Sequence, residues 1–292
     1  MAVDLTSFLA SRFKQMMGAA PAPQLGTKTA TVIAVAASKG GVGKTTTAVN
    51  LGAGLARYGS RRVLVVDLDP QGHVGSSLGI RGGSAAKQLS AVMAERQREV
   101  LDAAIPTRVC GLDITAPDKS LTESEQLLSA RIGKEFVLQQ ALHVTRTHYD
   151  CIVLDCPPSL GNLTVNALVA ADYLLVPCEY SLLSFQGVAD LIDAVQLVRE
   201  RLRAAVEILG ILVTQLDSRT KGLNREVESM LEAHYGPALL DTRIGVNTAI
   251  ARAQFAGESI YDFAPDSRGS TDYRALVDEV GLRLRERGRM GW

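Results

Sequence analysis

The chain has few cysteines, and their spacing does not indicate a site built on them. Its 292 residues include four cysteines, and no two of them form a Cys-x-x-Cys pair. Two of the four fall in a stretch that we predict to be a buried strand. This pattern indicates reduced thiols in a protein core rather than a disulfide framework.

The chain also lacks a long apolar run and a net charge. No apolar stretch approaches the ~20 residues that a membrane-spanning helix needs, and no secretory signal precedes the first predicted strand. Lys and Arg number 31 and Asp and Glu number 31, so any nucleic-acid site has to be a local basic patch. We therefore expect a soluble, cytoplasmic protein, and its 47% of apolar residues can form a sizeable core.

A glycine-rich segment carries the clearest chemistry. Residues 38–46, Ser-Lys-Gly-Gly-Val-Gly-Lys-Thr-Thr, follow an apolar run at 31–36 and lead into a helical pattern. In such a strand–loop–helix context the glycines let backbone N–H groups converge on a phosphate, and the helix start adds the positive end of its dipole. Lys44 can then reach the β- and γ-phosphates, and the Thr45 hydroxyl can ligate Mg²⁺. The predicted nucleotide-binding residues are Lys39, Gly40, Gly41, Val42, Gly43, Lys44, Thr45 and Thr46.

Two further apolar runs end in acidic residues. Asp67 and Asp69 end the run at 62–69, and Asp155 ends the run at 149–155. Continuous apolar runs of this kind suit parallel strands that are buried on both faces. Because ligands of open α/β sheets bind at the carboxyl edge of the strands, we expect these carboxylates near the phosphate loop.

Strand and helix patterns alternate along the chain. The alternation predicts a doubly wound α/β fold with a mainly parallel sheet and helices on both faces. A continuous helix is expected at 120–142, with Thr122 and Glu125 as a capping box. Further strands are expected at 112–116, 173–177 and 207–215, and a further helix at 185–203.

We expect one domain at 30–292, preceded by an arm at 1–29. The arm combines a short amphipathic helix pattern with a linker that is rich in Pro and Gly. Its apolar face could bind a partner, lie on a membrane surface or pack on its own domain, and the apolar periodicity does not distinguish these uses.

Several motifs together resemble the ParA/MinD family of ATPases. The phosphate loop has Ser38 where the usual motif has Gly, and Lys39 follows it, which resembles the family's deviant Walker A motif with its signature lysine. Asp-Leu-Asp-Pro-Gln-Gly at 67–72 matches the family, and Asp-Cys-Pro-Pro at 155–158 resembles its Walker B ending. The resemblance covers residues 31–284 and does not include the arm.

The resemblance implies a slow, partner-stimulated ATPase with ATP and Mg²⁺ as cofactors. Lys39 would reach across an ATP-dependent homodimer to the partner's nucleotide, and water would attack the γ-phosphate. The resemblance assigns the catalytic roles to Lys39, Lys44 and Asp69, and the metal site to Thr45, Asp67 and Asp155.

The ParA branch further implies sequence-independent binding of double-stranded DNA in the ATP state, and with it a nucleoid-associated location. A ParB-like protein or cargo adaptor would stimulate hydrolysis, in the segregation of a chromosome or plasmid or the positioning of another cargo. The expected DNA contacts are Arg219, Lys221, Arg243 and Arg252. The C-terminal arginines are equally compatible with DNA contacts and with a solvated basic helix end.

Other functions remain alternatives. A MinD-like membrane-cycling ATPase would use an amphipathic C-terminal helix, but the tail at 282–292 is dense in arginine and poor in apolar residues, so membrane binding is not expected. A metabolic or metal-delivery P-loop enzyme is a third class, and the cysteines lie mostly in predicted strands rather than where a shared iron–sulfur cluster would need them. An operon repressor would need a helix-turn-helix domain, for which the arm is too short.

Overall fold

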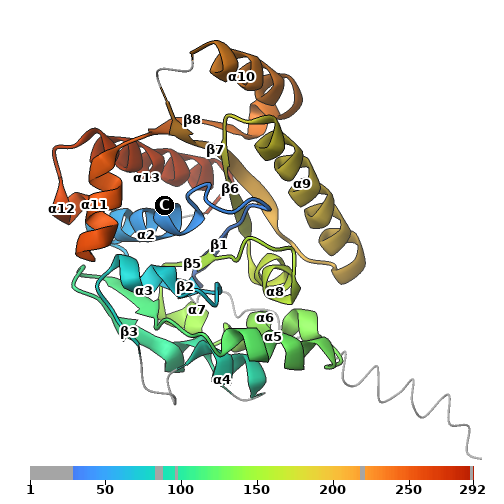
Figure 1. Cartoon of the computed structure of the whole chain (residues 1–292). Helices are drawn as coiled ribbons and strands as arrows, with labels where there is room; N and C mark the ends of the chain where they lie inside the picture. The colour runs from blue at the N-terminus through green and yellow to red at the C-terminus, as the bar shows by residue number, and fades with distance from the viewer. Residues whose placement is uncertain (1–28, 83–87, 96–97, 218–220, 290–291) are drawn as a thin grey trace, which may run out of the picture.

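A computed structural model describes residues 29–82, 88–95, 98–217, 221–289 and 292 of the chain (Figure 1). The predicted arm lies outside the described residues except for Thr29, and so does Arg219. The arm's helix and linker therefore stay predictions.

The described strands form one eight-stranded sheet in the order β3-β4-β2-β5-β1-β6-β7-β8. Every neighbouring pair is parallel except β3 and β4. This confirms the predicted doubly wound, mainly parallel architecture. The strands are β1 (Thr31–Val35), β2 (Val63–Asp67), β3 (Ala104–Pro106), β4 (Leu112–Thr115), β5 (Cys151–Asp155), β6 (Tyr173–Glu179), β7 (Glu207–Leu216) and β8 (Leu239–Gly245).

Helices cover both faces of the sheet, as Figure 1 shows. On one side lie α2 (Lys44–Gly59), α3 (His73–Ser77), α11 (Thr248–Ala256), α12 (Ile260–Phe263) and α13 (Arg268–Glu286). On the other lie α4 (Leu89–Ala94), α5 (Leu121–Ser129), α6 (Val137–Ala141), α8 (Asn162–Ala170), α9 (Leu182–Leu202) and α10 (Lys221–Tyr235). Shorter elements are η2 (Val100–Ala103), η3 (Lys134–Phe136), α7 (Thr145–His148) and η4 (Gly236–Ala238).

The strand alternation explains why the central strands are apolar throughout. In β1, Val32 and Ala34 point into the core under α8 and α9, whereas Ile33 and Val35 point into the core under α2 and α13. Both faces are buried, and the one polar residue of the strand is Thr31 at its start, whose hydroxyl accepts from the Trp292 indole at 3.1 Å. Polar chemistry is therefore concentrated at the carboxyl edge of the sheet.

The predicted continuous helix at 120–142 is wrong. The helix α5 ends at Ser129, and Gly133 adopts a left-handed conformation with φ 73° before η3 and α6 begin. A glycine in this conformation interrupts helical hydrogen bonding at little steric cost. The capping box is wrong too, because Ser120 is the N-cap and its side chain makes no capping bond. Glu125 instead accepts a hydrogen bond from the backbone N–H of Leu163 at 3.4 Å.

The prediction of reduced core thiols is confirmed for three of the four cysteines. Cys151, Cys156 and Cys178 are buried, and all four thiols are free. Cys110 is exposed, because it lies in the turn between β3 and β4 rather than in a strand of the core.

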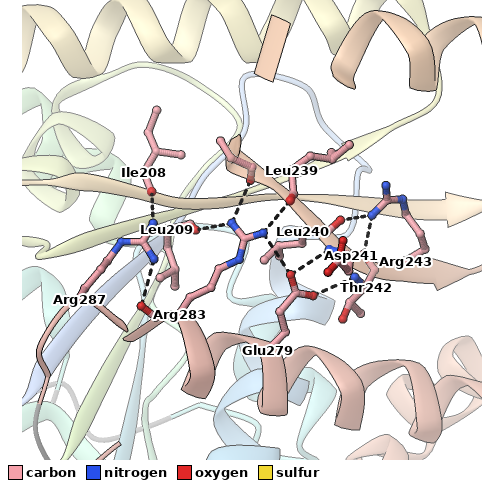
Figure 2. A network of polar contacts seen from close by, with 11 residues as sticks. Ile208, Leu209, Leu239, Leu240, Asp241, Thr242, Arg243, Glu279, Arg283 and Arg287 are labelled. Carbon is pink, nitrogen blue, oxygen red and sulfur yellow. Dashed lines mark hydrogen bonds and ion pairs between the residues drawn. The ribbon is translucent and has the colours of Figure 1, made fainter. Parts of the chain in front are cut away.

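The C-terminal helix α13 is bound to the sheet through its arginines rather than presenting them all to solvent (Figure 2). The Arg283 guanidinium donates to the backbone carbonyls of Leu209, Ala238 and Leu239 at 3.2, 3.4 and 2.6 Å. One turn earlier, Glu279 accepts from two backbone N–H groups of β8, both at 2.8 Å, and pairs with Arg283 at 3.2 Å. These bonds satisfy backbone groups where the β7–β8 register is irregular.

Two more tail arginines also bond to the body of the fold. Arg287 donates to the Ile208 carbonyl at 3.3 Å, and Arg289 pairs with Asp172 at 3.3 Å. Of the four tail arginines, Arg285 alone matches the interpretation of a solvated basic helix end, since it is exposed and its side chain bonds to none of the described residues.

Candidate functional site

The glycine-rich loop joins the carboxyl end of β1 to the N-terminus of α2, as predicted. Gly41 and Gly43 have φ values of 79° and 84°, a left-handed conformation that glycine adopts without a steric penalty. Gly43 is the N-cap of α2 and supplies no capping side chain. The first backbone N–H groups of α2 therefore remain available to an anion, in the field of the helix dipole.

Two cavities meet at this loop. The larger has a volume of about 660 Å³ and is lined by the loop, by Asp69 and by α3 and α11. The smaller, of about 340 Å³, lies between the loop, the end of β7 and α11, where Thr214 and Tyr273 line it. Both are lined by Gly41, Gly43, Thr46, Ala251 and Gln254. A ligand with a charged and an uncharged part can occupy the two together.

Lys44 is buried beside acidic groups. Its ammonium donates to the Lys39 carbonyl at 2.9 Å. Burial lowers the pKa of Lys44, and the nearby carboxylates of Asp155 and Asp69 oppose that shift. An anionic phosphate in the larger cavity would stabilise the charged form of Lys44 in the same way.

Asp155 is the most unusual group of the site. Its carboxylate is fully buried, and neither oxygen has a hydrogen-bond partner among the residues that the structure describes. Burial, and then repulsion from Asp67, raises the pKa of Asp155 far above its usual range, and the nearby Thr45 hydroxyl and Lys44 ammonium only partly oppose that shift. An unpaired buried carboxylate is costly, and a divalent cation held together with phosphate oxygens and the nearby Thr45 hydroxyl would offset that cost. The chain's own residues thus fit a magnesium ion.

The two acids of β2 have different surroundings. Asp67 lies opposite Asp155 in the β2–β5 register, and its oxygens accept the backbone N–H groups of Asp69 and Val74 at 3.1 and 3.0 Å. Burial raises the pKa of Asp67 to about 7. Asp69 lines the larger cavity and accepts from the Gln71 N–H at 2.9 Å. Asp67 thus holds the backbone that follows β2, Asp69 faces the cavity, and the metal role of Asp67 stays a prediction.

Lys39 does not line the larger cavity. Its ammonium forms an ion pair with Glu179, at the carboxyl end of β6, and the Ser181 hydroxyl also donates to that carboxylate at 3.2 Å. Val42 is buried in the core, and its carbonyl accepts from Thr214 at 2.8 Å. Of the eight predicted loop residues, six line the larger cavity: Gly40, Gly41, Gly43, Lys44, Thr45 and Thr46.

Of the four predicted DNA-contacting residues, Arg219 lies outside the described residues, and the other three lie on three different elements. Arg243 lies on β8, where it pairs with Glu228 at 3.3 Å and donates to the Tyr180 hydroxyl at 3.3 Å. Arg252 is exposed on α11, with its guanidinium 5.6 Å from the Phe263 ring. Lys221 begins α10.

Sequence reasoning missed the wall that α11 and the end of β7 add to the site. Gln215 has φ 53°, and its amide donates to the Gly41 carbonyl of the loop. Gln254 donates to the Thr46 hydroxyl at 2.8 Å. No local pattern marks either glutamine, because each meets the loop only through the fold.

A phosphate loop between a strand and a helix, with a buried carboxylate at the same sheet edge, defines a P-loop nucleotide-binding protein. Residues 30–208 match the AAA domain family. The chain belongs to that family and, within it, to the ParA/MinD proteins with a deviant Walker A motif.

Several known proteins are similar over most of their length. The chromosome-partitioning ATPase Soj of Thermus thermophilus is 41% identical over 254 residues, covering 87% of this chain and 96% of that protein. The chromosome partitioning protein ParA of Caulobacter vibrioides is 37% identical over 258 residues, covering 88% and 96%. A solved structure named cobyrinic acid a,c-diamide synthase, from Mycobacterium smegmatis with an ATP analog and magnesium bound, is 33% identical with a TM-score of 0.75 and covers 89% and 97%.

Proposed function

We propose that the chain is a ParA-type switch for segregating DNA or positioning another cargo. It binds ATP and Mg²⁺, forms a homodimer, and in that state binds double-stranded DNA without sequence preference. A ParB-like protein or cargo adaptor stimulates its otherwise slow hydrolysis of ATP. The observation that carries the proposal is the second loop lysine, Lys39, whose ammonium is directed to Glu179 rather than into the cavity of its own chain.

Large apolar side chains at the carboxyl edge of the sheet support the dimer. Leu182 and Leu183 begin α9 with 64% and 74% of their surface exposed, and Leu160 follows β5 with 40% exposed. Phe255 lines the larger cavity and is 97% exposed. Apolar side chains around a charged site are typical of a surface that a second protein covers. A second copy placed there would bring its Lys39 towards this nucleotide.

Each residue of the site has a distinct task in hydrolysis. Lys44 holds the terminal phosphates, and Asp69 accepts a hydrogen bond from the attacking water and orients it. Thr45, Asp67 and Asp155 would form the Mg²⁺ site, and the ion would neutralise charge on the phosphates. The partner's Lys39 would add a cation where negative charge develops at the γ-phosphate.

A membrane-cycling function has less support in the structure. Among the described residues, no helix has the length and apolarity that a membrane crossing requires. The apolar face of the C-terminal helix is already used, because Leu276, Val280 and Leu284 of α13 are buried in the core. We accordingly propose a cytoplasmic, nucleoid-associated protein.

A synthase function is the second candidate, because one similar structure carries the name of a cobyrinic acid a,c-diamide synthase. The two functions differ in what accelerates ATP turnover. A switch responds to DNA and to a basic segment of an adaptor, whereas a synthase responds to its acceptor acid. Turnover that rises with cobyrinic acid and not with DNA would favour the second candidate.

Changing Arg219 to Glu should weaken DNA binding at least ~30-fold while leaving ATP-dependent dimerisation intact. The reason is that one phosphate contact is lost and a repelling charge is added. Fluorescence anisotropy with a random-sequence duplex measures the binding, and light scattering measures the dimer. Arg199→Glu, at an exposed position of α9, is the matched control. Equal losses in the two variants would show a general charge effect and contradict a contact at Arg219.

A further inference from the structure

Gln254 lies where the two cavities of the nucleotide site meet. Its side-chain amide donates to the Thr46 hydroxyl at 2.8 Å, across 208 positions of the sequence. Thr46 belongs to the first turn of α2, and both residues line both cavities. A nucleotide whose phosphates occupy one cavity and whose remainder occupies the other would therefore lie beside both Thr46 and Gln254.

The direction of this hydrogen bond determines whether the Thr46 hydroxyl can donate to a ligand. A threonine hydroxyl accepts through its lone pairs and donates one proton. Because the Gln254 amide donates, the Thr46 proton is left to point elsewhere, and a phosphate oxygen at the start of α2 is an acceptor for it. Hydrogen bonds in such a chain strengthen one another. Gln254 is therefore placed to orient Thr46 towards an anion.

The helix that carries Gln254 is capped at both ends but buries few of its side chains. The Asn247 side chain accepts from the Ala249 N–H at 2.8 Å at its start, and the Gly257 N–H donates to the Gln254 carbonyl at 3.1 Å at its end. Of its nine residues, Ala253 alone is fully buried, with Ala249 and Ile250 partly buried. A helix of this length is marginal without tertiary contacts, so the polar contact to the phosphate-loop helix adds to the caps in stabilising it. The same helix presents Arg252 and Phe255 to solvent.

We propose that Gln254 couples occupancy of the nucleotide site to the ordering of α11. A nucleoside phosphate that accepts from Thr46 strengthens the Gln254–Thr46 bond and stabilises α11. By linkage, an ordered α11 raises the affinity for the nucleotide by the same factor. Nucleotide binding is thereby transmitted to the surface that bears Arg252 and Phe255. This inference rests on the nucleotide binding in the proposed function and requires neither DNA binding nor dimerisation.

Hydrogen exchange of the full chain, with and without ADP and Mg²⁺, tests the coupling. In the unaltered protein, nucleotide should slow amide exchange in residues 39–47 and also, about fivefold or more, in residues 248–256. Gln254→Met keeps the size and helix propensity of the side chain and removes the donor. It should abolish most of the slowing at 248–256 and retain the slowing at 39–47. Gln196→Met, at an exposed position of α9, should behave as the unaltered protein does.

A double-mutant cycle on ADP affinity separates coupling from a general weakening of the fold. Thr46→Val removes the same bond without changing any residue of α11, and it also removes the hydroxyl that donates to the phosphate. Gln254→Met should lose about fivefold in affinity, Thr46→Val at least as much, and the double variant no more than Thr46→Val alone, whereas independent effects would multiply. Independent losses, or slowing at 248–256 that persists in Gln254→Met, would overturn the proposal. Absence of slowing at 39–47 in the unaltered protein would instead contradict nucleotide binding itself.

Discussion

Replacing Lys44 with alanine should lower the affinity for ATP about 100-fold and remove every nucleotide-dependent behaviour of the chain. The Lys44 ammonium is buried at the end of the loop, and its bond to the Lys39 carbonyl leaves it further donors for phosphate oxygens. Loss of one or two charge-assisted hydrogen bonds in a buried site costs about 3 kcal/mol, which corresponds to that factor.

Isothermal titration with ATP and Mg²⁺ measures this loss. Lys119→Ala, which removes an exposed lysine far from the loop in sequence, should bind as the unaltered protein does. Because Lys44 is buried, the thermal unfolding of both variants without nucleotide should be compared first. A folded Lys44→Ala protein with unchanged affinity would show that the loop does not hold the phosphates.

Replacing Asp69 with alanine should have the opposite outcome, since ATP should still bind while hydrolysis falls about 10³-fold. A positioned acid or base contributes roughly 10²–10⁴ to such a step. Asp69 lines the cavity, and its carboxylate bonds to the Gln71 backbone, so its removal should leave Lys44, Thr45 and Asp155 in place. The ATP-bound homodimer should therefore accumulate.

Single-turnover hydrolysis and light scattering with ATP test this second prediction together. Asp266→Ala, at an exposed position before α13, is a control that should hydrolyse ATP normally. An Asp69→Ala protein that stays monomeric with ATP would contradict the assignment of a trapped dimer. One that hydrolyses ATP at the normal rate would remove Asp69 from the reaction.

The parts of the site that could be predicted from sequence are those that a short, continuous stretch of residues defines. The phosphate loop, β2 with its two acids and β5 with Asp155 each combine an apolar run with a polar ending within about ten residues, and the parallel sheet then brings these endings to one edge. The helix break at Gly133 was missed because helical periodicity continues on both sides of it.

The parts that could not be predicted depend on contacts between distant segments. The Lys39–Glu179 pair spans 140 positions and the Gln254–Thr46 bond spans 208. Periodicity shows which face of a helix is apolar, but it does not show which polar side chain meets another element. The tail arginines illustrate the same limit, since their spacing is that of a solvated face although Arg283 binds backbone carbonyls of the sheet.

The central claim is that ATP converts the chain into a sequence-independent DNA-binding dimer. Its most direct test is binding to a random-sequence duplex with ATP, with ADP and without nucleotide, over a series of salt concentrations. The account predicts binding with ATP alone, with an affinity that falls steeply and linearly on a logarithmic salt scale. Absence of binding in every nucleotide state at low salt, or equal binding in all three, would contradict it.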